Sequence, residues 1–380
     1  MSEIRVDSIG NESNTGGPEL SGITEFSGQQ YFIPPRGTTA ERPSGCPPGS
    51  IRFNTDSSHL EYWNGLVWLE FEASSEHVGV STFSAGISAI GTGHRGLIAG
   101  GNTPDLKNEI EYISISTLGN SQDFGDLTDP KTGTVGCASG TRGIFSNAAL
   151  SSSRTDDIDF VTFASTGDAQ DFGDSTESVA YRGALSNSTR GVIAGGEHPN
   201  GTVIDTIDYI TIASTGAAKD FGNLLGNRVT SGGGASPVRG IFAGGSSADE
   251  IHYITISSTG NAQDFGDLLA GTVAITGCSS STRCVFGGIR NPGYVNDMEF
   301  ITIASTGNSQ DFGDQTDNRG GAGGAASSTR GVWGGGYGQP LFRNTLDYVT
   351  IASLGNAIDF GEMTYKADRV AGCSNGHGGL

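Results

Sequence analysis

The chain has 380 residues, 62 of them glycine, and a formal net charge of −20. This acidic balance repels the phosphates of nucleic acids and anionic membrane surfaces, so we expect neither as a partner. No apolar run reaches the ~18 residues that a membrane-spanning helix needs, and the first residues lack the apolar centre of a signal peptide. The high glycine content favours short strands joined by tight turns over helices.

Residues 1–48 differ from the rest of the chain. They are polar and rich in Gly, Asn and Ser, and prolines punctuate residues 34–48. Such a composition predicts an extended arm.

Residues 49–77 predict a small β-meander. Three alternating segments, 50–54, 60–63 and 67–71, are separated by turn residues. A sheet this small cannot bury Trp63, Trp68 and Phe71 by itself. We therefore expect it to pack on a partner or on its own copies, as an oligomerisation element.

Six near-copies of one sequence segment follow, each ending in Asp-Phe-Gly. The aspartates are 48, 49, 44, 47 and 48 residues apart, so the repeat is about 47 residues long. A kinase magnesium motif occurs once, beside a Gly-rich loop and a His-Arg-Asp segment, and that interpretation fails here. The period instead indicates a repeat architecture. The repeated pairs are Asp123 and Phe124, Asp171 and Phe172, Asp220 and Phe221, Asp264 and Phe265, Asp311 and Phe312, and Asp359 and Phe360.

Each repeat contains four short β-type segments separated by glycine turns. Residues 207–214 and 218–225 are two examples. Four strands per repeat predict an all-β fold, a six-bladed β-propeller of four-stranded blades over residues 78–380, preceded by the small arm. The apolar strand that ends in Gly-Gly and the later strands with large aromatics resemble the kelch-type repeat. Phenylalanine stands where kelch has tryptophan, and Ser146-Asn147 replaces one glycine pair.

Two segments resemble the first strand of a further repeat, residues 83–90 and 369–375. A closed ring needs only one of them. We expect the C-terminal copy to join the ring by completing or backing the first blade, which removes exposed sheet edges.

The repeated residues have structural interpretations. We expect each phenylalanine to be a buried wedge between blades. We expect each aspartate to accept backbone hydrogen bonds in its turn, or to pair with a repeated arginine of a neighbouring repeat. Rings of charge could instead bind a ligand or calcium, but no Asp-x-Asp-x-Asp loop is present.

Cys137, Cys278 and Cys373 occupy one repeat slot, so we expect them to be buried and unpaired. The six histidines are scattered. We therefore expect no metal, no cofactor, no catalytic residues and no enzymatic activity.

Loops on the two ends of a propeller differ in kind. One set, such as Ser-Thr-Gly-Asn-Ala-Gln, is nearly uniform, and the other varies in length and content. Varied loops favour binding. The candidate binding residues on that face are Glu197, His198, Arg290, Tyr294, Tyr337, Phe342 and Arg343; they could also be ordinary loop residues.

Residues 4–18, 36–43, 49–56 and 60–65 are similar to the starts of tail-fibre and other virion structural proteins of tailed bacteriophages, especially those of marine cyanobacterial phages. This resemblance implies an N-terminal arm that docks on the virion and often trimerises, with a distal domain facing outward.

We therefore expect a virion protein, assembled in the host cytoplasm, whose arm binds other virion proteins. We expect a homo-oligomer, with a trimer favoured, and a propeller that displays a recognition face for a host surface glycan or protein. The alternatives are a purely architectural head, neck or tail decoration and, less favoured, a glycan-active enzyme.

Overall fold

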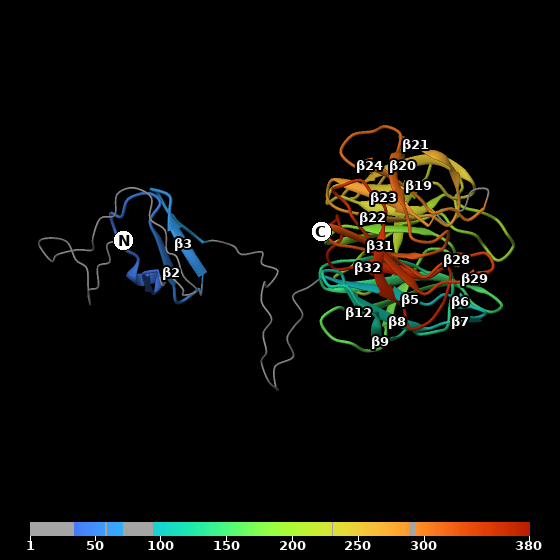
Figure 1. Ribbon diagram of the computed structural model, residues 1–380, viewed down its shortest axis with the longest axis horizontal. Helices are drawn as coiled ribbons and strands as arrows, with labels where there is room; N and C mark the ends of the chain where they lie inside the picture. The colour runs from blue at the N-terminus through green and yellow to red at the C-terminus, as the bar shows by residue number, and fades with distance from the viewer. Residues whose placement is uncertain (1–33, 58, 71–93, 230, 289–292) are drawn as a thin grey trace, which may run out of the picture. The chain divides into compact units, whose positions relative to one another are not determined.

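The computed structural model describes residues 34–57, 59–70, 94–229, 231–288 and 293–380. The chain divides into two compact units, Met1–Ser81 and Thr82–Leu380 (Figure 1). Within the described ranges there is no α-helix, only one 3-10 turn, Thr39–Glu41. No described helix is therefore long and apolar enough to cross a membrane.

The first unit is one four-stranded sheet. Its order is β1 (Arg36–Gly37), β2 (Ile51–Asn54), β3 (His59–Trp63) and β4 (Trp68–Glu70). The three predicted strands are confirmed to within one or two residues at each end. Arg36–Gly37, which the sequence placed in the extended arm, pairs in parallel with β2.

Charged groups occupy the centre of this small sheet. Glu61 is fully buried and lies 2.6 Å from the Arg42 guanidinium and 3.5 Å from Arg52. Hydrogen bonds from Arg42 hold the pKa of Glu61 below its usual value. Ile51, Leu60 and Leu69 are exposed to 50%, 41% and 38%. The unit therefore places polar groups inside and leaves apolar side chains outside.

The described residues of the second unit form six four-stranded antiparallel sheets, which confirms the all-β prediction. Sheet 1 holds β32 (Ala371–Ser374), β5 (Arg95–Ala99), β8 (Glu109–Ser114) and β9 (Gln122–Asp126). Sheet 2 holds β10 (Val135–Ala138), β11 (Arg142–Ala149), β12 (Arg154–Thr162) and β13 (Gln170–Asp174). Sheet 3 holds β14 (Gly183–Ser186), β15 (Arg190–Ala194), β16 (Thr206–Thr211) and β17 (Lys219–Asn223).

Sheet 4 holds β18 (Gly232–Ala235), β19 (Arg239–Ala243), β20 (Ala248–Thr255) and β21 (Gln263–Thr272). Sheet 5 holds β22 (Thr276–Ser279), β23 (Arg283–Gly287), β24 (Asp297–Thr302) and β25 (Gln310–Asp314). Sheet 6 holds β26 (Gly323–Ala326), β27 (Arg330–Gly334), β30 (Thr345–Thr350) and β31 (Ile358–Glu362). Two short hairpins, β6–β7 (Asn102–Thr103, Asp105–Leu106) and β28–β29 (Tyr337–Gly338, Leu341–Phe342), lie in loops.

The C-terminal strand completes the first sheet, as predicted. β32 pairs antiparallel with β5, and the two lie side by side in Figure 1. The other candidate segment, residues 83–90, lies outside the described residues. The first strands of the sheets also contact one another in a cyclic order: β32, β10, β14, β18, β22, β26 and again β32.

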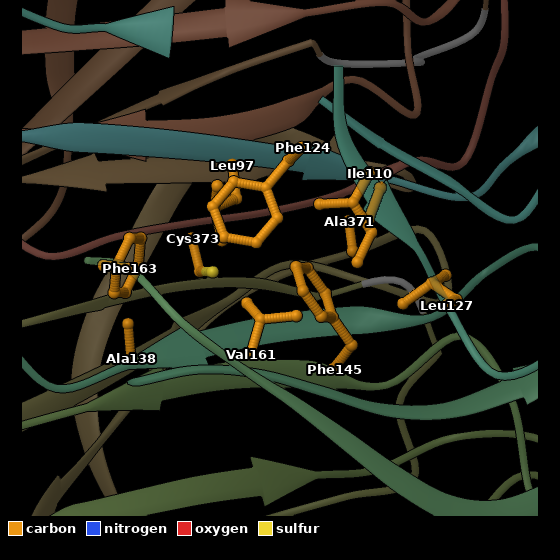
Figure 2. Packing of buried hydrophobic residues seen from close by; sticks show 11 residues of the cluster. Leu97, Ile110, Phe124, Leu127, Ala138, Phe145, Val161, Phe163, Ala371 and Cys373 are labelled. Carbon is orange, nitrogen blue, oxygen red and sulfur yellow. The ribbon is translucent and has the colours of Figure 1, made fainter. Parts of the chain in front are cut away.

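The phenylalanines of Asp-Phe-Gly are buried between sheets, as predicted. All six are 2–3% exposed. Figure 2 shows Phe124 of sheet 1 in one cluster with Phe145 and Val161 of sheet 2. Each phenylalanine also meets an aromatic ring of the third strand edge-on, with ring centroids 5.9–6.1 Å apart.

The backbone of Asp-Phe-Gly joins each sheet to the next. The phenylalanine carbonyl accepts a hydrogen bond of 2.7–2.9 Å from the glycine N–H of the following sheet's uniform turn, at Gly119, Gly167, Gly216, Gly260, Gly307 and Gly355. The last bond runs from Gly119 of sheet 1 to Phe360 of sheet 6. The glycine of Asp-Phe-Gly has a φ of +135 to +150°, and a Cβ there would collide with the backbone of the neighbouring turn. The motif is therefore a contact between sheets.

The aspartate prediction is largely wrong. All six Asp-Phe-Gly aspartates are exposed, and none forms an ion pair within the described ranges. Only Asp171 caps its turn, accepting a hydrogen bond of 3.0 Å from the Gly173 N–H. These carboxylates lie near the start of the fourth strand of each sheet, where they are exposed and water solvates them at little cost.

The repeated arginines bind backbone instead. Each donates a hydrogen bond of 2.6–3.1 Å to a carbonyl of the next sheet, from Arg95, Arg142, Arg190, Arg239, Arg283 and Arg330. Each also lies over the third-strand aromatic of its own sheet, 4.4–4.9 Å from the ring centroid. A guanidinium can serve both contacts at once, because its donors are in its plane and its faces are apolar.

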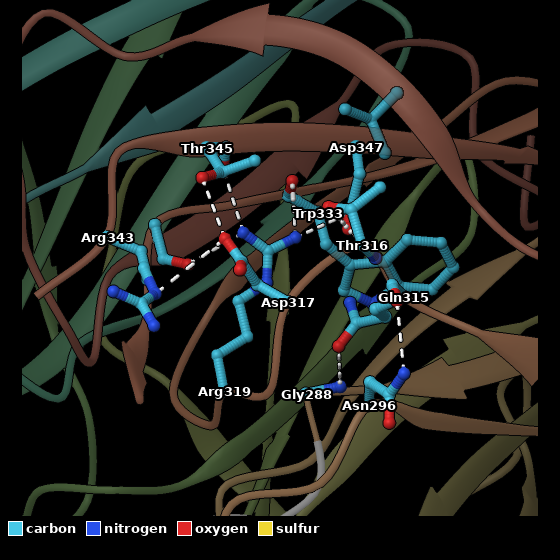
Figure 3. Close-up of polar contacts among 12 residues, drawn as sticks. Gly288, Asn296, Gln315, Thr316, Asp317, Arg319, Trp333, Arg343, Thr345 and Asp347 are labelled. Carbon is cyan, nitrogen blue, oxygen red and sulfur yellow. Dashed lines mark hydrogen bonds and ion pairs between the residues drawn. The ribbon is translucent and has the colours of Figure 1, made fainter. Parts of the chain in front are cut away.

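The third strand carries a buried polar residue opposite each motif aspartate: Glu111, Asp159, Asp208, His252, Glu299 and Asp347. Three of them form buried ion pairs, Lys131–Asp159, Arg182–Asp208 and Arg319–Asp347. Figure 3 shows the Arg319 guanidinium between Asp347 and the Thr345 carbonyl. Burial raises the pKa of Glu111 and Glu299, which have hydroxyl and backbone N–H partners but no cation.

The cysteine prediction is also confirmed. Cys137, Cys278 and Cys373 are buried and free, and burial raises the pKa of each thiol.

A glycine substitution tests the contact between sheets. Gly222→Ala places a Cβ against the Gly260 backbone at a φ of +146°. We expect the free energy of unfolding to fall by about 2–4 kcal/mol in urea titrations. Gly140→Ala, in open space with an ordinary φ, should change it by less than about 0.5 kcal/mol. Equal effects of the two substitutions would contradict this role.

A second prediction concerns pH. Burial, and then nearby Arg228, lower the pKa of His252 to about 4. The unfolded imidazole titrates near 6.5, so the unfolded state binds the proton first and stability falls as the pH drops from about 6.5 towards 4. Between pH 7 and 5 the wild type should lose about 1–2 kcal/mol more than His252→Gln in urea titrations. The same pH slope for both proteins would show that His252 is not responsible.

Candidate functional site

The varied loops bring several predicted residues together. The rings of Tyr294 and Tyr337 meet edge-on at 5.3 Å, and Tyr337 meets Phe342 at 5.1 Å. These residues come from loops of sheets 5 and 6, so an aromatic cluster spans the two. All three are half-buried.

Two of the charged candidates have their own local partners. His198 Nε2 is 2.9 Å from a carboxylate oxygen of Glu177, and the Arg343 Nε is 3.7 Å from Asp317 (Figure 3). Arg290 lies outside the described residues. His198 and Arg343 are therefore each engaged by a neighbouring carboxylate.

A cavity of about 190 Å³ lies among the varied loops and the loops that precede the first strands. Two predicted residues, Glu197 and Tyr294, line it, together with Tyr181, Asp368 and Arg369. The lining comes from loops that precede first strands and from loops that join second to third strands. The cavity is thus on the face that varies between repeats.

Four of the loops before first strands contribute an equivalent residue to this cavity, namely Tyr181, Ala274, Gly321 and Arg369. Two positions before the strand, the described residues are Gly133, Tyr181, Ala274, Gly321 and Arg369, all with φ between +55 and +72°. Neighbours in this series are joined by backbone hydrogen bonds of 2.7–3.1 Å, including one from the Gly133 N–H to the Arg369 carbonyl. The left-handed conformation therefore belongs to the architecture, and glycine suits it best.

Tyr181 and Arg369 are costly choices at such positions. A non-glycine residue in the left-handed region costs about 1–2 kcal/mol. The Arg369 Nη1 donates to the Tyr181 hydroxyl at 3.2 Å, and its guanidinium lies 5.1 Å from the Tyr181 ring centroid. Arg154 lies 5.1 Å from the same centroid. A Cβ at Gly133 would collide with the Tyr181 ring, so the small residue there makes room for the large one.

A second cavity of about 150 Å³ shares Tyr181, Ala274, Gly321 and Arg369 with the first. It runs along the first strands of the sheets to His377. At that end the His377 Nε2 lies 2.9 Å from the Ala138 carbonyl, and the Gly378 N–H donates to the Ser279 carbonyl at 2.8 Å. Burial lowers the pKa of His377 and favours the neutral imidazole. The C-terminal residues thus bridge first strands of different sheets at the end opposite Arg369.

The site offers binding chemistry in the form of two tyrosine rings, one guanidinium and two carboxylates. In the part of the chain that the structure describes, no three His, Cys, Asp or Glu side chains gather as a metal site would require. The carboxylic acids whose pKa is raised, Glu111, Asp126 and Glu299, do not line either cavity.

Sequence reasoning missed Tyr181 and Arg369, the two residues at the centre of the site. The signal was available in the repeat itself, because their slot holds glycine or alanine at residues 133, 274 and 321. A large side chain in a slot otherwise occupied by small residues indicates a local demand that the repeat does not share.

No protein-family model matches this chain, and no curated protein matches it.

The conformational cost at the cavity can be measured at Ala274, which has a φ of +57°. Ala274→Gly should raise the free energy of unfolding by about 0.5–1 kcal/mol, because relief of the left-handed strain exceeds the added entropy of the unfolded chain. Ala326→Gly, on a buried strand, should lower it by about 1–2 kcal/mol. Destabilisation by both substitutions in urea titrations would contradict the strain.

Proposed function

We propose that the six sheets of the second unit are the blades of a closed six-bladed β-propeller. The cyclic order of first-strand contacts supports this, as does the pairing of β32 with β5. The six phenylalanine–glycine hydrogen bonds, the last of which joins sheets 6 and 1, support it further.

We propose that the protein is a tail-fibre-like virion structural protein of a tailed bacteriophage. Much of the sequence that resembles phage virion proteins, residues 36–43, 49–56 and 60–65, falls in the four-stranded sheet of the first unit. We assign this unit to docking on other virion proteins and to self-association, with a trimer favoured. Its exposed Ile51, Leu60 and Leu69 would supply apolar contact area.

We propose that the propeller displays a host-recognition face. The observation that carries this proposal is the difference between the two sets of loops. The uniform turns are used in hydrogen bonds between sheets, whereas the varied loops surround a cavity lined by Tyr181, Arg369, Glu197 and Tyr294. Loops that differ between repeats, placed around a cavity on a rigid scaffold, suit recognition.

The test uses antibodies raised against the purified full chain. Immunogold electron microscopy should place the protein at the tip of a fibre, and purified chain added in excess should lower the adsorption rate of the particles at least tenfold. Labelling of the head or neck with unchanged adsorption would favour the architectural alternative. Unlabelled particles would refute a virion role.

A further inference from the structure

We propose that the cavity beside Tyr181 and Arg369 binds one neutral monosaccharide ring through its hydroxyl groups. This inference rests on the proposed recognition function and names the ligand class for that face.

The first argument is the charge balance of the lining. The Arg369 guanidinium presents only donors, whereas the Glu197 and Asp368 carboxylates present only acceptors. An anionic ligand would meet the two carboxylates, and a cationic ligand would meet the arginine. A hydroxyl both donates and accepts, so a polyhydroxylated neutral ring can satisfy both kinds of group.

The second argument is the aromatic wall. Tyr181 and Tyr294 line the same cavity. The C–H face of a sugar ring is apolar and fits against an aromatic face, whereas its edge carries the hydroxyl groups. The Arg154 and Arg369 guanidiniums already lie on the Tyr181 ring, so Tyr294 supplies the aromatic surface for the C–H face, and the charged groups meet the hydroxyl edge.

The third argument is that the side chains are held in place. Arg369 is bound to the Tyr181 hydroxyl at 3.2 Å, and Arg154 lies on the same tyrosine ring. The Arg369 Nε is 3.8 Å from its neighbour Asp368. Pre-organised side chains lose little entropy on binding. Glycine would be more stable in the left-handed backbone that Tyr181 and Arg369 adopt. The two side chains are therefore retained there in spite of a conformational cost.

The experiment is saturation-transfer difference NMR on the full chain. The probes are D-glucose, D-galactose and D-mannose, with D-glucuronate as the anionic and D-glucosamine as the cationic comparison. At least one neutral hexose should bind, at least tenfold more tightly than its charged counterparts. Binding of none of the three neutral hexoses, or equal or tighter binding of a charged sugar, overturns the proposal.

The variants Tyr181→Gly and Arg369→Gly separate binding from folding. Glycine occupies the equivalent positions at residues 133 and 321, so both variants should fold, as urea titrations will check. Each should weaken hexose binding at least tenfold, whereas the control variant Gly140→Ala, outside both cavities, should bind as the wild type does. Wild-type affinity in both Tyr181→Gly and Arg369→Gly would place the sugar elsewhere and overturn the proposal.

The adsorption measurement distinguishes the two levels of inference. If purified chain blocks adsorption but binds no hexose, the recognition function stands and this ligand assignment fails. If a hexose binds at the cavity but adsorption is unaffected, the ligand site stands and the host-recognition role fails.

Discussion

The hydrogen bond between the phenylalanine carbonyl of Asp-Phe-Gly and the turn glycine of the next sheet is the contact on which the rest of this unit depends. It occurs at all six junctions, including Phe360 with Gly119. The bond brings two backbones too close for a side chain, so glycine is needed on the strand whose phenylalanine carbonyl accepts the bond, and the same strand buries that phenylalanine between the sheets. One short motif therefore fixes both the spacing and the filling between sheets, which explains why it is repeated with so little change.

This constraint separates the two ends of the sheets. The uniform turns are engaged with the neighbouring sheet and cannot vary without loss of packing. The loops around Glu197, Tyr294 and Tyr337 are not needed for this packing, because buried ion pairs and backbone hydrogen bonds next to them already stabilise the sheets. Sequence variation can accumulate there at little cost in stability, and recognition chemistry can be built on a scaffold that does not need those side chains.

The sequence predicted what periodicity can reveal. The repeat length, the four strands, the buried Phe124 and its equivalents, the free cysteines and the closing C-terminal strand all follow from spacing and residue type. The prediction failed where a side chain binds the backbone. Nothing in the side-chain pattern shows that Arg330 donates to the Ile115 carbonyl and that Asp359 is exposed to water. Tyr181 and Arg369 were missed for a related reason: a left-handed φ is a property of the fold and is hidden when the residue is not glycine.

Residues 369–378 link the completion of sheet 1 to the candidate site. β32 completes sheet 1, Arg369 just before it lines the cavity on the varied face, and His377 just after it lies against the Ala138 carbonyl at the other end. The Arg369 carbonyl also accepts the Gly133 hydrogen bond, which joins the end of the chain to the loop before sheet 2. The cavity therefore exists only when the last strand has paired, because one of its walls arrives with that strand. Under the proposed function, a chain that has not completed its first sheet would lack the recognition cavity, so binding at this face would depend on complete folding.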